Sequence, residues 1–257
     1  MDELLYEVRD GIGRITFNRP ASRNALTFAM YERLAEICAD AGSRDGLRAL
    51  ILTGAGERAF AAGTDIGQFR AFTRPEDAIE YEARLDRVLD VLERCPVPTI
   101  AAIAGACTGG GAGIAASCDL RIAARNARFG FPIARTLGNC LSMANYARLS
   151  ELIGSARVTE IIFTARLIEA EEARAIGLVS EVLDDAAALA TRADDLARLV
   201  AGHAPLTLRA TKEALRRLRA HSAGDGHDLI EQCYMSADFR EGMEAFLAKR
   251  PPVWRGA

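Results

Sequence analysis

The sequence predicts an α/β protein in which strands and helices alternate over the first 140 residues or so, followed by a helical C-terminal part. Residues 47–53 and 99–104 are predominantly apolar, as expected of strands buried on both faces of a sheet. Glycines follow both runs and lead into helical periodicity, which favours parallel strands joined by right-handed crossovers. From about residue 141 helical periodicity dominates, with one short strand expected near residues 178–182.

The N-terminal elements follow from local signals. Residues 4–9 and 12–18 flank Asp10-Gly11, a dipeptide typical of a β-hairpin turn. A helix is predicted over residues 27–41, because its apolar positions recur at helical spacing. Thr27 has the short side-chain oxygen that an N-cap needs.

A second helix is predicted over residues 75–94, with one apolar face formed by Leu85, Val88, Leu89 and Leu92. After the strand at 99–104, a glycine-rich segment opens a helix of small residues that runs to about Ser117. Residues 120–124 again resemble a strand. Between residues 185 and 249 nearly every position fits a helix, so this part is expected to pack on the core or on a neighbouring subunit.

Composition is that of an ordinary globular protein, with 257 residues, 50% apolar residues and a net charge of −3. We expect a core over residues 1–195 and a helical oligomerisation region over residues 196–257. The slight negative charge argues against nucleic acid as a partner. The charged N-terminus and the lack of an apolar run of about 20 residues predict a cytoplasmic protein that does not enter a membrane.

Cysteine and histidine usage does not suggest a metal site. The six cysteines are scattered among apolar or small residues, without a CxxC pair, and we expect reduced, mostly buried thiols. The three histidines all fall late in the chain, and none belongs to an HExxH motif. We therefore expect no metal and no separate cofactor.

Two glycine-containing segments, residues 58–66 and 103–113, carry most of the functional information. Each closes a β-rich apolar run and opens into a helical pattern, which leaves backbone N–H groups free at a helix N-terminus. Two such corners facing each other would form an oxyanion hole with two main-chain donors.

Part of the second segment, Gly111-Ala112-Gly113-Ile-Ala-Ala116, nearly fits the dinucleotide-binding pattern G-x-G-x-x-A. That site also needs an acidic residue about 20 positions later for the ribose. No Asp or Glu occurs between Leu120 and Ser150, so a nicotinamide or flavin site is not favoured.

Six segments resemble the enoyl-CoA hydratase/isomerase (crotonase) superfamily in order and spacing. They include an Asn-Arg-Pro motif, Phe-Ala-Ala-Gly-Thr-Asp-Ile and the glycine run, and they cover residues 18–26, 60–66, 101–113, 118–132, 167–179 and 240–250. The resemblance implies a crotonase-like spiral of ββα units with a helical C-terminal trimerisation region. It also implies an acyl-CoA substrate, in which coenzyme A is part of the substrate rather than a cofactor.

By matching position, the thioester carbonyl would lie between the backbone N–H groups of Thr64 and Gly110. Backbone near Ala62, Thr64 and Ile66 would line the adenine pocket, and Arg23 would lie near the CoA phosphates. Phe246 and Lys249 match C-terminal positions that reach CoA across a subunit boundary. That last similarity implies a homotrimer or a dimer of trimers.

The two glutamates that the family's hydratases use for water addition fall on Gly113 and Ile133 in this sequence. General acid–base catalysis needs groups that hold water and return a proton. The sequence therefore argues against hydration by the usual glutamate pair.

The segment after residue 134 offers replacements. Asn139 could orient water or a substrate hydroxyl, and Arg135 could hold a substrate carboxylate. Cys140 is a possible nucleophile, although a buried inert thiol is favoured. Ser142 is expected to be a helix N-cap. Acidic or phenolic groups could also come from Glu80, Tyr81 or Glu82, depending on which face that helix presents.

Taken together, these residues favour an acyl-CoA lyase or isomerase that stabilises a thioester enolate or oxyanion without the usual glutamates. Hydrolysis or decarboxylation of an acyl-CoA on the same fold is the first alternative. A non-catalytic acyl-CoA binder is the second, and it would show only apolar side chains near the reacting carbons.

Overall fold

The computed structural model describes residues 2–43, 46–71, 73–220, 236–248 and 250–257. Its larger sheet has the order β1-β2-β3-β5-β7-β10, and its smaller sheet has the order β4-β6-β8-β9. The larger sheet consists of β1 (Leu4–Arg9), β2 (Ile12–Phe17), β3 (Ala49–Gly54), β5 (Thr99–Ile103), β7 (Leu120–Ala124) and β10 (Glu181–Leu183). The smaller sheet consists of β4 (Ala59–Ala61), β6 (Ala106–Thr108), β8 (Arg128–Gly130) and β9 (Ile168–Glu169).

The helices of the N-terminal half are η1 (Pro20–Ser22), α1 (Phe28–Asp40), η2 (Ile66–Ala71), α2 (Pro75–Glu93), α3 (Gly110–Ser117) and α4 (Ile133–Thr136). Those that follow are α5 (Met143–Ile153), α6 (Ser155–Thr164), α7 (Ala170–Ala175), α8 (Ala186–Ala201), α9 (Pro205–Arg219) and α11 (Ala237–Ala248). No helix in the described ranges is both long and apolar enough to cross a bilayer.

The chain winds as a spiral of ββα units, which confirms the predicted fold class. β3, β5 and β7 of the larger sheet are each followed by a strand of the smaller sheet and then by a helix. In the larger sheet as described, β2, β3, β5, β7 and β10 pair in parallel, whereas β1 is antiparallel to β2. Successive turns therefore stack, and the corners between strand and helix fall at the same edge.

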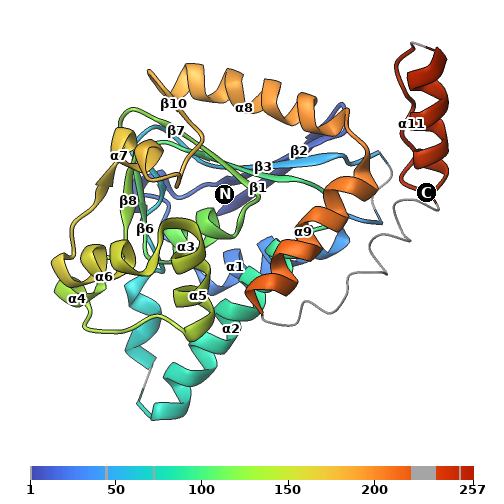
Figure 1. Cartoon of the computed structure of the whole chain (residues 1–257). Coiled ribbons are helices and arrows are strands. Elements are labelled where there is room, and N and C mark those ends of the chain that lie inside the picture. The colour runs from blue at the N-terminus through green and yellow to red at the C-terminus, as the bar shows by residue number, and fades with distance from the viewer. Residues whose placement is uncertain (1, 44–45, 72, 221–235, 249) are drawn as a thin grey trace.

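The central strands β3 and β5 of the larger sheet are buried on both faces, which explains their predominantly apolar sequences. One face packs against α1, α2 and α3, and the other face packs against α8. Figure 1 shows α8 above this sheet and the three N-terminal helices below it. The boundary that we expected at residues 195–196 falls inside α8, which is one continuous helix.

Most predicted elements lie where the sequence places them, and Thr27 caps α1 by accepting from the Met30 N–H at 3.3 Å. The strand expected at residues 178–182 is displaced to β10. Leu178 and Val179 still donate their N–H groups to the Ala173 carbonyl at 2.8 and 3.2 Å, beyond the left-handed turn at Gly177. These two residues therefore complete the end of α7 and cannot join the sheet.

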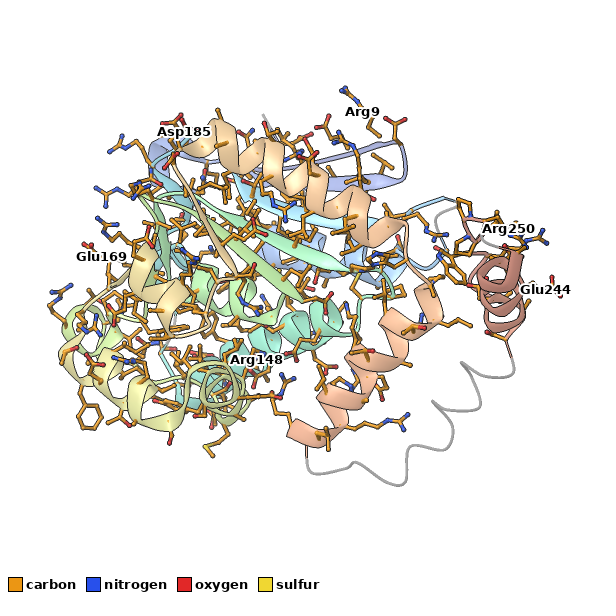
Figure 2. The ribbon with its side chains drawn as sticks, turned by 45° about the horizontal axis from the view of Figure 1, so that its top comes forward. Arg9, Arg148, Glu169, Asp185, Glu244 and Arg250 are labelled. Atoms are coloured by element: carbon orange, nitrogen blue, oxygen red, sulfur yellow. The ribbon has the colours of Figure 1, made fainter. Side chains whose placement is uncertain are left out.

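A buried ion-pair cluster joins three helices below the sheet. Arg148 of α5 has a side chain only 4% exposed and forms a bidentate pair with Glu93 of α2, at 2.8 and 2.9 Å. Arg219 of α9 contacts the same carboxylate at 2.6 Å. Figure 2 shows Arg148 pointing into the space between these helices. The cluster fixes α9 against the core.

Candidate active site

A cavity of about 190 Å³ lies between the two glycine-rich corners, α2 and the segment that joins α4 to α5. Its wall is mostly apolar, with a few polar groups that converge on the interior, as is typical of small-molecule sites. The lining residues that bear on chemistry are Thr64, Glu82, Gly110, Gly113, Asn139 and Asn145.

The first corner holds Thr64 between two backbone hydrogen bonds. The Leu26 N–H donates to the Gly63 carbonyl at 2.8 Å, and the Asp65 N–H donates to the Leu26 carbonyl at 2.9 Å. Asp65 also accepts from the Gly67 N–H at 3.0 Å, which caps the start of η2, and pairs with Arg19 at 2.8 Å. Within the described ranges, the Thr64 N–H has no backbone acceptor.

The second corner is the start of α3. Gly109, with φ 52°, is the N-cap and donates its N–H to the Gly130 carbonyl at 3.0 Å. The Gly110 N–H follows in the first turn, where helices leave their donors free. It finds no backbone acceptor among the residues the structure describes. The two corners are close, since a Cβ atom on Gly63 would lie 3.9 Å from the Gly110 nitrogen.

Three hydroxyl groups connect the first corner to α1 and α2. The Thr64 Oγ1 lies 2.8 Å from the Tyr31 hydroxyl and 2.8 Å from the Tyr81 hydroxyl. Burial raises the pKa of Tyr31 far above its usual range and that of Tyr81 to about 12, so both phenols remain protonated at neutral pH. A side chain at Gly110 would overlap the Tyr31 hydroxyl, so this position requires glycine for space.

Neither position of the family's glutamates provides a carboxylate. Gly113 lines the cavity without a side chain, and a Cβ atom there would have ordinary contacts with Leu89 at 3.4 Å and Asn145 at 3.8 Å. Ile133 lines the cavity with a buried apolar side chain.

One carboxyl group does reach the cavity, from α2. The Glu82 Oε2 atom is fully buried and has no hydrogen-bond partner within the described residues. Burial and the nearby charge of Asp86 raise the pKa of Glu82 to about 7, although a hydrogen bond from the Ser142 backbone opposes this. Asp86 itself accepts from the Ser142 hydroxyl at 2.6 Å and from the Asn145 amide at 3.4 Å.

Sequence reasoning named Glu82 only as one of three options on this helix. The signal was nevertheless in the spacing, because Glu82 stands three and seven positions before Leu85 and Leu89 and so shares their buried face. Glu80 is exposed to solvent. An acid on an apolar helix face marks a buried carboxyl, and such groups gather at functional sites.

Several residues predicted from the sequence meet at this cavity. Ala62, Thr64, Ile66 and Asn139 all line it. Arg23 does not line it, but its carbonyl accepts from the Ala62 N–H at 3.1 Å, which brings Arg23 beside the first corner.

Other predicted residues lie elsewhere. Arg135 is exposed on α4 and is absent from the cavity wall. The expectation of a buried thiol at Cys140 is wrong, because this cysteine lies in the open segment before α5 and is exposed. Ser142 is the N-cap of α5, as predicted. The Phe246 side chain and all of Lys249 fall outside the described residues.

A larger cavity of about 470 Å³ lies between α9 and the C-terminal end of α3. Its charged groups already pair with one another, as in Lys212 with Asp119 and Arg219 with Glu93, both at 2.6 Å. These groups are engaged in holding α9, so the smaller cavity is the better candidate for chemistry.

Comparisons with known proteins identify the family of this chain. The sequence profile described as Enoyl-CoA hydratase/isomerase matches residues 7–257. The short-chain-enoyl-CoA hydratase of Clostridium acetobutylicum is 33% identical over 97% of this chain and 96% of its own length. The mitochondrial methylglutaconyl-CoA hydratase of Mus musculus is 32% identical, over 98% of this chain and 82% of its own.

Among solved structures, the enoyl-CoA hydratase/carnithine racemase from Magnetospirillum magneticum superposes with a TM-score of 0.92 at 33% identity. The match covers 100% of this chain and 97% of that one. Similarity of this extent defines the class, an acyl-CoA enzyme with the crotonase fold. The chain belongs to the enoyl-CoA hydratase/isomerase family.

Proposed function

We propose that this protein is an acyl-CoA lyase or isomerase that forms a thioester enolate, held by the N–H groups of Thr64 and Gly110, without the usual pair of glutamates. The observation that supports it is the position of these two N–H groups, which lie on one cavity wall and lack a backbone acceptor in the described part of the chain.

Removing a proton next to a thioester moves negative charge onto the carbonyl oxygen. Fixed amide donors that point to this oxygen stabilise the charge without transferring a proton, and each contributes about 2.7–4 kcal/mol to the transition state. The hydroxyls of Tyr31 and Tyr81 hold the Thr64 side chain from both sides, which keeps the first corner in one conformation. The apolar wall excludes water and so strengthens the interaction.

The CoA portion is proposed to extend from this cavity along the first corner. The backbone at Ala62 and Ile66 would contact the adenine, and the exposed Arg23 guanidinium would lie near the phosphates. Asn139 lines the opposite side and would orient a polar group of the acyl chain. Arg135 would meet only a substrate that protrudes from the cavity.

The decisive experiment separates the loss of the Gly110 N–H from the effect of adding a side chain there. Any side chain at Gly110 would overlap the Tyr31 hydroxyl, so the variants are made in a Tyr31→Phe background. Gly110→Pro and Gly110→Ala both add a Cβ atom, but only proline lacks the N–H. We expect the proline variant to be about 100-fold to 1,000-fold slower than the alanine variant on any acyl-CoA substrate that turns over. Equal rates would exclude oxyanion donation by Gly110.

Substrate choice is tested with crotonyl-CoA for hydration and 3-hexenoyl-CoA for isomerisation, beside a binding titration with butyryl-CoA. Turnover of either enoyl thioester would support enolate chemistry. Tight binding of butyryl-CoA with turnover of neither would exclude it and leave hydrolysis, decarboxylation or a binding role.

A further inference from the structure

Glu82 lines the cavity and has one carboxyl oxygen without a hydrogen-bond partner among the described residues. In the described lining, Glu82 is the one side chain carrying a carboxyl, amine, imidazole or guanidinium group. Its Oε2 atom is buried and has no hydrogen-bond partner in the described part of the chain. A buried polar atom without a partner is costly, so structures that retain one usually use it.

Glu82 lines the cavity that also holds the two N–H donors, so its carboxyl group lies beside the reacting space. The Ser142 backbone N–H binds the carboxyl group from the segment before α5. Gly113 lines the same cavity and has no side chain to fill the space that a larger residue would take. The two N–H donors at Thr64 and Gly110 belong to the same wall.

We infer that Glu82 is the catalytic proton carrier of this site, moving one proton between C2 and C4 of an enoyl-CoA whose double bond lies between C3 and C4. The inference rests on the proposed enolate chemistry and names its acid–base group and its substrate class.

The step balances with no further reactant. The Glu82 carboxylate accepts the C2 proton, and the C–H electron pair forms the C1–C2 double bond of the enolate, whose oxygen carries the charge. The Glu82 carboxylic acid then returns the proton to C4, which takes the electron pair of the C3–C4 double bond. The enolate electrons form the C2–C3 double bond, and the carbonyl is restored.

A 1,3-proton shift fits this cavity better than hydration. The same carboxyl accepts and returns the proton, so one group is enough, whereas addition of water needs a second group that holds the water. Gly113 and Ile133 supply no such group. Burial also brings the pKa of Glu82 to about 7, so acid and base forms are both populated near neutral pH, as an efficient proton carrier requires.

The first test measures the proton-removal step alone. Butyryl-CoA has C2 protons but no double bond, so its exchange in D2O, followed by NMR, reports enolate formation. We expect Glu82→Gln to slow exchange by at least about 100-fold while binding of butyryl-CoA is retained. The matched control is Glu80→Gln on the exposed side of the same helix, which should exchange at the wild-type rate. Wild-type exchange in Glu82→Gln, or no exchange in the unmodified enzyme, would overturn the inference.

Folding is separated from catalysis by thermal unfolding at pH 8. The raised pKa of Glu82 in the folded protein means that the stabilising protonated form is lost as the pH rises through about 7. The Glu82→Gln variant should therefore unfold at the same temperature as the unmodified protein or at a higher one.

The proposed enolate function and the proposed role of Glu82 can be contradicted independently of each other. Slow turnover in Gly110→Pro with full exchange in Glu82→Gln would keep the enolate function and remove Glu82 from it. Faster hydration of crotonyl-CoA than isomerisation of 3-hexenoyl-CoA would overturn the 1,3-shift.

Discussion

Glu82 illustrates how the surroundings of a single residue set its chemistry. Its carboxyl is desolvated by the cavity wall and repelled by Asp86, one helical turn further along α2. The ionisable groups that interact with it are Asp86 and Tyr81 on α2 and Tyr31 on α1. The two phenols stay neutral at physiological pH, so Asp86 is the nearby charge that tunes the carboxyl.

The pH dependence of activity should therefore follow Glu82 and respond to Asp86. Because the carboxylate form accepts the C2 proton, kcat/KM for 3-hexenoyl-CoA should rise with pH and level off above about 7. Asp86→Asn removes the like charge and should move the midpoint to lower pH, while the amide oxygen can still accept from the Ser142 hydroxyl. Pre-steady-state or steady-state rates across pH 5–9 measure the shift. An unchanged midpoint in Asp86→Asn would contradict this origin of the shift.

The residue scale is also where sequence reasoning was least complete. Matching positions identified Thr64 and Gly110, because a backbone donor depends on its place in a corner and not on side-chain type. Arg135 and Asn139 lie only four positions apart, yet one is exposed outside the cavity and the other lines it. Spacing in an irregular segment does not tell which way a side chain points.

At the scale of elements, two tight connections set the position of the chemistry. β4 leads into the first corner and β6 into the second, and these strands pair in parallel within the smaller sheet. Parallel pairing places the ends of both strands at one edge, so their following N–H groups approach each other. The spiral thus brings together corners that are more than 40 residues apart in sequence.

Helix α9 depends on the buried cluster of Glu93, Arg148 and Arg219. Burial alone would raise the pKa of Glu93, but hydrogen bonds and charge from Arg148, together with Arg219, lower it below the usual range. The stabilisation is present above the unfolded-state pKa of a glutamate and is lost as the pH falls through the lowered folded value.

Breaking this cluster should strongly destabilise the fold. Arg148→Ala leaves the buried Glu93 carboxylate with one partner fewer, and we expect a loss of about 3–5 kcal/mol in the free energy of unfolding. Arg125→Ala is the matched control, since its pair with Asp184 is exposed and such pairs contribute about 0–1 kcal/mol. Urea unfolding at pH 7 compares the two. Equal losses of unfolding free energy in Arg148→Ala and Arg125→Ala would show that the buried cluster stabilises the fold no more than an exposed ion pair does.

At the scale of the whole molecule, the C-terminal helix stands apart from the cavity. Figure 1 shows α11 at the right edge of the view, beyond α9, whereas α4 beside the cavity is at the left edge. Helix α11, which includes position 246, therefore lies away from the cavity of its own chain. This separation supports the proposal that Phe246 contacts CoA bound to a neighbouring subunit.

We accordingly expect a homotrimer or a dimer of trimers in solution. Light scattering coupled to gel filtration should give three or six times the mass of one chain. Removal of residues 237–257 should weaken binding of butyryl-CoA by about tenfold or more, because a contact to the ligand is lost. The control variant that combines Gly110→Pro with Tyr31→Phe should keep the oligomer mass of the unmodified protein. A monomer that binds butyryl-CoA with full affinity would contradict this arrangement.

The sequence by itself predicted the fold class and most strands of the larger sheet, but not the four short strands of the smaller sheet, and it singled out Thr64 and Gly110 as candidate backbone donors. These depend on local signals, such as buried apolar runs, glycine corners and capping residues, which act within a few positions along the chain. The sequence also shows that Gly113 and Ile133 stand where the family's hydratases have their two glutamates.

Only the tertiary structure shows which carboxyl group reaches the cavity in their absence. Whether Glu80 or Glu82 faces the cavity depends on how α2 rotates against the core, and the raised pKa of Glu82 depends on its burial and on the charge of Asp86. The orphaned oxygen and the line of hydroxyls from Tyr31 through Thr64 to Tyr81 arise from contacts between elements distant in sequence. Desolvation and charge act through space, so their effect appears once the chain has folded.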